Sequence, residues 1–195
     1  MGIALYLTLS RILISPIFVG VYIYYDKLGI DLIFLPYVLL FLFGISELSD
    51  IFDGFLARRY NKVTELGKLL DPMADSIFRL SVFLAFTQGV VQLPLLLVCL
   101  FFYRDSVIST LRTVCALRGV ALAARLSGKI KAVIQAMTGF FILILFIPYS
   151  LGVLKEDLFQ EISLYSVSAA LIYTLYSGVE YIYANRMYIK KALGF

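Results

Sequence analysis

The chain of 195 residues contains no histidine and only two cysteines. The lack of histidine removes the most versatile general base and a frequent metal ligand, so any proton transfer is expected to depend on a carboxylate. Cys99 and Cys115 lie in or beside apolar segments with no motif spacing around them. We interpret them as small core residues rather than as a disulfide or a metal-binding pair.

Charged residues are also scarce, at 15% of the chain, whereas 62% of the residues are hydrophobic and the mean hydropathy is +0.94. A soluble domain has about 25% charged and about 45–50% apolar residues, so this composition indicates a membrane protein. A spanning helix needs about 20 mostly apolar residues. The sequence therefore predicts an all-α integral membrane protein, a single domain over residues 1–195, with six transmembrane helices at 9–25, 33–57, 68–88, 93–115, 129–150 and 160–184.

Basic residues are unevenly distributed between the two sides of these spans. The connections 26–32, 89–92 and 151–159 contain only Lys27 and Lys155. By the positive-inside rule the opposite side is cytoplasmic, so we expect both termini in the cytoplasm of a multi-pass protein of the inner membrane. The basic residues of that side are Arg58, Arg59, Lys62, Lys68, Arg118, Arg125, Lys129, Lys131, Arg186, Lys190 and Lys191.

Four aspartates stand at the cytoplasmic ends of the second and third predicted spans. Asp50 and Asp53 are three residues apart and Asp71 and Asp75 are four apart, so each pair shares one helical face. Carboxylates at membrane depth are costly and usually line a functional cavity. Oxygen ligands without cysteine or histidine favour Mg²⁺ or Mn²⁺ over Zn²⁺, and two such ions about 3.5–4 Å apart can hold both ends of a phosphoryl displacement. We expect such a metal site here.

Small residues accompany the aspartates on the same helical faces. Gly54 and Ala57 lie on the stripe of the first pair, and Gly67 lies one turn before the second pair. A glycine inside a helix costs roughly 1 kcal/mol against alanine, which suggests that something approaches the backbone closely. Arg58 lies at the end of this stripe, and its planar guanidinium group is suited to binding phosphate oxygens. These residues predict a cleft for a phosphorylated ligand.

Other readings of the acids remain open. Asp75 could pair with Arg79 at one-turn spacing, although such pairing does not account for all four aspartates. Glu47 could reach the metal cluster or pair with a base. Intramembrane acids also mark ion pathways in small cation or proton transporters, but here they gather on one side and no internal repeat is visible. Without a nucleic-acid-binding motif, we expect no nucleic-acid partner.

The spacing of these residues resembles the signature of the CDP-alcohol phosphotransferase family, D-x2-D-G-x2-A-R followed by G-x3-D-x3-D. The six predicted spans agree with the six-helix membrane domain of that family, so the resemblance covers nearly the whole chain. The matching positions are Asp50, Asp53, Gly54, Ala57 and Arg58, then, after eight residues, Gly67, Asp71 and Asp75.

The resemblance implies a reaction and a role for each matched residue. Members move a phosphatidyl or similar group from a CDP-linked donor to an alcohol, release CMP and are typically homodimers. Asp75 would take the proton from the acceptor hydroxyl. The ligands of two Mg²⁺ or Mn²⁺ ions would be Asp50, Asp53, Asp71 and Asp75. The donor nucleotide and its pyrophosphate would lie against Gly54, Ala57, Arg58 and Gly67.

Two later segments narrow the choice of acceptor. The run Arg104-Asp-Ser-Val-Ile-Ser-Thr-Leu-Arg112 and the run Gly128-Lys-Ile-Lys131 resemble the phosphatidylglycerophosphate synthase subgroup of that family. This implies CDP-diacylglycerol, a membrane lipid, as donor and glycerol 3-phosphate as acceptor. An acceptor phosphate needs an anion pocket, and cations inside apolar spans are costly unless they are paired. The candidates for that pocket are Arg104, Arg112, Lys129 and Lys131.

The sequence leaves more than one identity open for the acceptor molecule. Arg104 could instead form an ion pair with Asp105 or with a carboxylate of another span. Ser76 and Ala132 stand where the subgroup usually has lysine and threonine. The acceptor could therefore be inositol phosphate, serine or phosphatidylglycerol. In each case we expect a membrane transferase of phospholipid biosynthesis whose active site faces the cytoplasm.

Overall fold

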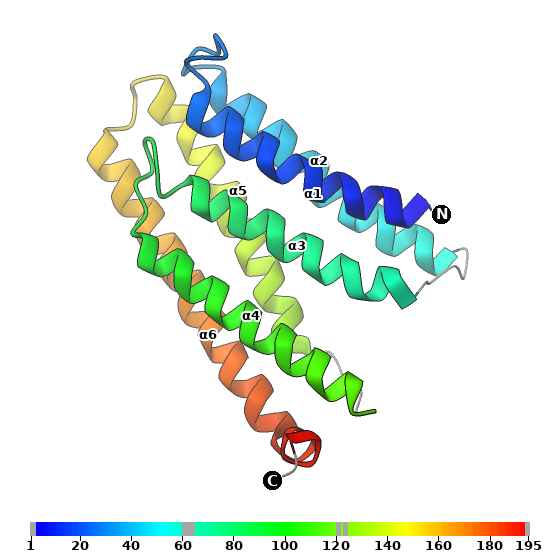
Figure 1. Cartoon of the computed structure of the whole chain (residues 1–195). Helices are drawn as coiled ribbons and strands as arrows, with labels where there is room; N and C mark the ends of the chain where they lie inside the picture. The colour runs from blue at the N-terminus through cyan, green and yellow to red at the C-terminus, as the bar shows by residue number, and fades with distance from the viewer. Residues whose placement is uncertain (1–2, 60–64, 120–121, 123–124, 194–195) are drawn as a thin grey trace. The chain divides into compact units, whose positions relative to one another are not determined.

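The computed structural model describes residues 3–59, 65–119, 122 and 125–193, of which 3–9, 50–59, 65–72 and 191–193 are described by their backbone alone. Within this part of the chain every element of regular structure is a helix (Figure 1), which confirms the all-α prediction. The helices are α1 (Ile3–Tyr24), α2 (Leu35–Arg59), α3 (Glu65–Ala85), α4 (Leu95–Leu117), α5 (Leu126–Ser150) and α6 (Glu156–Leu193).

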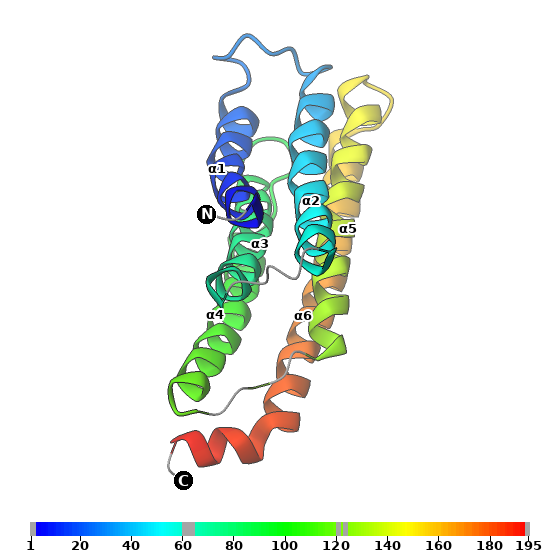
Figure 2. The same ribbon diagram turned by 90° about the vertical axis from the view of Figure 1, so that its right-hand side faces the viewer.

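Each predicted span coincides with one of these helices, but several helices extend beyond the apolar run that predicted them. The first begins at Ile3 rather than at residue 9, and the last continues to Leu193 rather than ending at 184. In Figure 2 the final turns of α6 bend away from the preceding part of the helix. These turns contain polar residues such as Arg186 and Lys190, which a hydropathy criterion excludes but which form helix readily.

Apolar length supports the membrane assignment for part of the described chain. The stretches Leu126–Ser150 and Glu156–Lys190 are long and apolar enough to cross a membrane. Shorter apolar stretches run over Ser10–Tyr24 and Leu35–Ser49. The apolar lengths of these helices thus fit a membrane protein, while the number of six spans stays a prediction.

The chain divides into two compact units, and α5 and α6 each contribute residues to both. The first unit consists of residues 1–93 and 139–163, and the second of residues 94–138 and 164–195. In the first unit α1 lies against both α2 and α3 (Figure 1).

Aromatic side chains form the core of the first unit. Phe18 of α1 contacts Phe78 of α3 edge to face, with ring centroids 6.1 Å apart, and Phe78 lies 5.4 Å from Phe43 of α2. Gly139 of α5 permits the close approach of that third ring, since a Cβ at Gly139 would stand 3.0 Å from Phe43 Cε2. Interlocked rings of this kind hold α1, α2, α3 and the end of α5 together.

The second unit has a separate core formed by α4 and the later part of α6. Ile108, Cys115, Tyr181 and Ile189 are its buried members, together with Leu122. Cys115 is fully buried and both cysteines are free thiols, which confirms the core interpretation for Cys115.

Candidate active site

Helices α2 and α3 carry the whole aspartate motif, and the two helices lie next to one another in the first unit. Of the motif, Asp75 has a described side chain. The remaining positions are helical in backbone, but their side chains lie outside the described part, so their contacts stay predictions. They are Asp50, Asp53, Gly54, Ala57, Arg58, Gly67 and Asp71.

Asp75 forms an ion pair with Arg11 of α1, whose Nη1 donates a hydrogen bond to Asp75 Oδ1. The Arg11 side chain is 1% exposed and that of Asp75 is 17% exposed. A buried guanidinium is tolerated when a carboxylate accompanies it. The pair therefore explains why an arginine interrupts the apolar run of α1, and it ties α1 to the residue expected to act as the base.

Arg79, the partner considered for Asp75 from its spacing, lies instead near Glu47. Its Nη1 is 4.0 Å from Glu47 Oε1, between α3 and α2. Of the two roles left open for Glu47, pairing with a base is therefore the one that the contact supports. A carboxylate so placed also compensates a largely buried arginine.

The chemistry of the motif suits a divalent ion. Its four acids offer oxygen atoms alone, the ligand type that Mg²⁺ and Mn²⁺ prefer, and they come from two adjacent helices. The partial exposure of Asp75 leaves its carboxylate within reach of the surface. Among the described side chains no three His, Cys, Asp or Glu residues gather closely enough to hold a metal ion, but three of the four motif aspartates are not among them.

The second unit brings two of the predicted acceptor-binding cations together around Asp105. Arg104 Nη1 donates to Asp105 Oδ1 at 2.9 Å, and Lys131 Nζ lies 2.8 and 3.0 Å from the two Asp105 oxygens. These three side chains are each about nine-tenths buried. Arg104 thus forms the ion pair with Asp105 that the sequence left open, and Lys131 shares the same carboxylate. The other two candidates, Arg112 of α4 and Lys129 of α5, are exposed.

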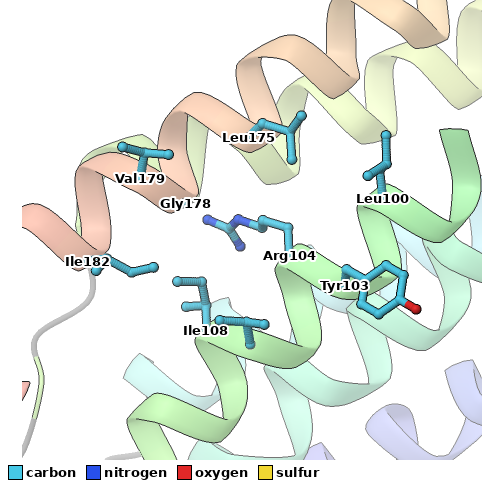
Figure 3. A pocket seen from close by; sticks show the side chains of 9 residues that line it. Leu100, Tyr103, Arg104, Ile108, Leu175, Gly178, Val179 and Ile182 are labelled. Carbon is cyan, nitrogen blue, oxygen red and sulfur yellow. The ribbon is translucent and has the colours of Figure 1, made fainter.

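Helix α6 holds the same guanidinium from the opposite side. Arg104 Nη2 donates to Ser177 Oγ at 2.8 Å, and the Ser177 hydroxyl donates to the carbonyl oxygen of Thr174 at 2.8 Å. Arg104 also borders a pocket of about 210 Å³ between α4 and α6 (Figure 3). The other residues that line this pocket are Leu100, Tyr103, Val107, Ile108, Leu175, Gly178, Val179 and Ile182.

Comparison with known proteins shows to which family this chain belongs. The profile of the CDP-alcohol phosphatidyltransferase family matches residues 1–176 of this chain. The chain belongs to that family. Membership confirms the resemblance seen in the aspartate motif, and it makes the chain an enzyme of the transferase class rather than a transporter.

Several bacterial relatives are similar over nearly their full length, and all three described here are named CDP-diacylglycerol–glycerol-3-phosphate 3-phosphatidyltransferase. The relative from Rickettsia typhi is 32% identical over 94% of this chain and 96% of its own length. The Bacillus subtilis relative is 30% identical over 92% of both chains. The Salmonella typhimurium relative is 31% identical over 92% of both chains.

The sequence alone assigns no role to Ser177 or Gly178, and it offers Asp105 only as an alternative partner for Arg104. Nor does it pair Arg11 with Asp75. The available signals were isolated polar residues in apolar helices, since a buried polar group needs a partner. The sequence does not tell which partner is chosen, because the pairs are 64 residues apart for Arg11 and 73 apart for Ser177.

Proposed function

We propose that the chain transfers a phosphatidyl group from CDP-diacylglycerol to glycerol 3-phosphate and releases CMP and phosphatidylglycerophosphate. The observation that carries this proposal is the similarity, over more than nine-tenths of the chain, to relatives that bear the name of this reaction. The buried cations of the second unit support a phosphorylated acceptor. Serine offers no phosphate to such cations, and phosphatidylglycerol offers only a diester.

The donor would be held by the aspartate motif of α2 and α3. Gly54, Ala57 and Gly67 would leave room for the cytidine nucleotide, and Arg58 would bind one of its phosphates. When bound, two Mg²⁺ or Mn²⁺ ions would neutralise the negative charge of the donor pyrophosphate. Their ligands would be Asp50, Asp53, Asp71 and Asp75.

The transfer step exchanges one phosphorus–oxygen bond for another. The acceptor hydroxyl oxygen forms a bond to the phosphorus of the phosphatidyl group, while the bond from that phosphorus to CMP breaks and CMP leaves with its electron pair. The hydroxyl proton passes to the Asp75 carboxylate. Arg11 orients that carboxylate by holding Oδ1 from α1, which keeps the base in one position between turnovers.

The acceptor phosphate would be bound by the basic residues of α4 and α5. Arg104 and Lys131 supply two buried donors for its oxygens, and Asp105 fixes both in place. Arg112 and Lys129 add exposed positive charge that attracts the dianion. Inositol phosphate would use the same kind of pocket, so it is the acceptor against which glycerol 3-phosphate must be tested.

We further propose that residues 1–195 form one domain with six spans in the inner membrane, that both termini and the catalytic cleft face the cytoplasm, and that the enzyme works as a homodimer. The asymmetric distribution of basic residues supports this orientation. The apolar lengths of α5 and α6 support insertion into the membrane.

The proposal is tested by CMP release from purified protein in detergent micelles with CDP-diacylglycerol and Mg²⁺. Glycerol 3-phosphate, inositol phosphate, serine and phosphatidylglycerol are offered in parallel. Turnover is expected with glycerol 3-phosphate, absent in Asp71→Asn and retained in Asp157→Asn, which changes an exposed acid at the start of α6. Turnover only with another acceptor would overturn the acceptor assignment, and no CMP release with any acceptor would overturn the donor assignment.

A further inference from the structure

One turn of α6, residues 177–180, contacts the basic segments of both α4 and α5 within the second unit. Ser177 accepts from Arg104 Nη2 at 2.8 Å. Glu180 accepts from Ser127 Oγ at 2.6 Å and lies 2.6 Å from Arg125 Nη2, at the start of α5. Ser127 directly precedes the run Gly128–Lys131. A single helical turn thus touches Arg104 of the first acceptor segment and residues just before the second.

We propose that Ser177 and Gly178 are positioning residues that hold Arg104 in the orientation required by the acceptor phosphate, with Glu180 fixing the adjoining start of α5. This inference rests on the proposed function, because it assigns these residues to the acceptor site of that reaction. It goes beyond that function, since no element of the family motif lies in this turn.

Gly178 acts by having no side chain. A Cβ at this position would stand 3.0 Å from Arg104 Cγ, closer than packed atoms normally approach, and 3.4 Å from Nε. Figure 3 shows the Arg104 side chain extending from α4 toward Gly178 on α6. The stem of the arginine therefore lies directly on the α6 backbone, in space that any other residue would fill.

Ser177 acts through its fixed hydroxyl. Its hydrogen is donated to the carbonyl oxygen of Thr174, so a lone pair of Oγ faces Arg104 Nη2. On the other side Asp105 Oδ1 accepts from Nη1 at 2.9 Å. The guanidinium is thus held from α4 and from α6 at once, and the conformational entropy that a free arginine loses on binding a ligand is largely lost already on folding.

The contacts of Arg104 with the described residues use its two outer nitrogens. Its buried Nε has no hydrogen-bond partner among the described residues. Leaving a buried donor unsatisfied is costly. In the orientation set by Ser177 and Gly178, the outer nitrogens of Arg104 therefore donate hydrogen bonds and Nε does not.

The test measures the KM for glycerol 3-phosphate in Gly178→Ala and Ser177→Ala. A rise of about tenfold is expected in each, the effect of weakening one charge-assisted hydrogen bond, with the KM for CDP-diacylglycerol unchanged. Gly20→Ala is the matched control, because a Cβ there meets nothing within 4 Å. Ser163→Ala controls the second change, since that buried hydroxyl of α6 donates to the Phe159 carbonyl.

A second measurement does not depend on catalysis: the rise in melting temperature of the full chain on addition of inorganic phosphate. Wild type and both controls are expected to be stabilised, and Gly178→Ala and Ser177→Ala to lose most of that shift. If wild type is inactive but keeps the phosphate effect and the two variants lose it, the proposed function fails and the positioning role stands. If the two variants match their controls in every measurement that wild type supports, or if wild type shows neither turnover nor a phosphate shift, the inference is overturned.

Discussion

Arg11 of α1 and Asp75 of α3 form a buried ion pair between two helices, with the arginine side chain 1% exposed. The pair joins the opening helix to the residue proposed as base. Its integrity therefore bears on both folding and catalysis.

Removing the arginine is expected to destabilise the first unit. Arg11→Ala leaves Asp75 without this compensating charge, which for a buried pair lowers the free energy of unfolding by about 3–5 kcal/mol. CMP release is expected to fall as well, because the carboxylate loses the donor that orients it. Thermal unfolding in detergent micelles and initial rates of CMP release check the two effects.

Two further variants serve as comparisons for Arg11→Ala. Arg11→Lys keeps the positive charge and is expected to lie between wild type and Arg11→Ala, whereas Arg118→Ala, at an exposed site, is expected to change little. An Arg11→Ala protein that unfolds at the wild-type temperature and turns over normally would show that the pair has neither role.

Metal removal is expected to abolish activity reversibly. Carboxylate oxygens bind Mg²⁺ and Mn²⁺ well, so chelation with EDTA should stop CMP release and either ion should restore it. Asp53→Asn is expected to remain inactive at every metal concentration, because it removes a proposed ligand. Full activity in the presence of excess EDTA would contradict the metal site.

Gly139 is expected to be intolerant of a side chain for packing reasons alone. In Gly139→Ala the new Cβ would stand 3.0 Å from Phe43 Cε2 and 3.1 Å from Cζ, and overpacking of this kind costs about 1–3 kcal/mol. Gly44→Ala is the comparison, since a Cβ there has nothing within 4 Å. Melting temperatures decide the matter: equal values for the two variants would mean that the α5–α2 contact is not tight.

The existence and order of the helices could be predicted from the sequence, because apolar runs separated by basic and glycine-containing connections set both. The aspartate motif could also be recognised, since its members are close in the chain. Helix ends were less predictable: α6 continues through Asn185, whose side chain bonds the Tyr181 carbonyl one turn back, although the apolar pattern has ended.

Long-range partners could not be predicted, because spacing identifies a helical face and not the residue opposite it. Arg79 illustrates the difference. Its spacing favoured Asp75, but tertiary packing places it by Glu47 and gives Asp75 to Arg11. The division of α5 and α6 between two compact units could likewise not be predicted from the sequence, since both are continuous helices.

The orientation in the membrane is expected to follow the basic residues. In a variant that lacks Cys99 and Cys115, a cysteine placed at Asp26 should react with a membrane-impermeant maleimide added to intact spheroplasts, whereas one placed at Arg118 should react only after permeabilisation. Both positions are exposed, so access depends on sidedness. The reverse pattern would invert the topology and move the aspartate motif away from the cytoplasm.

Transfer of the phosphatidyl group to glycerol 3-phosphate can be measured directly by following labelled glycerol 3-phosphate into lipid. Purified protein is supplied with CDP-diacylglycerol and Mg²⁺, and CMP and chloroform-soluble label are measured in the same reaction. Equal amounts of CMP and labelled phosphatidylglycerophosphate are expected, with both products absent in Asp71→Asn. CMP released without label in the lipid phase, or label incorporated without CDP-diacylglycerol, would contradict this transfer.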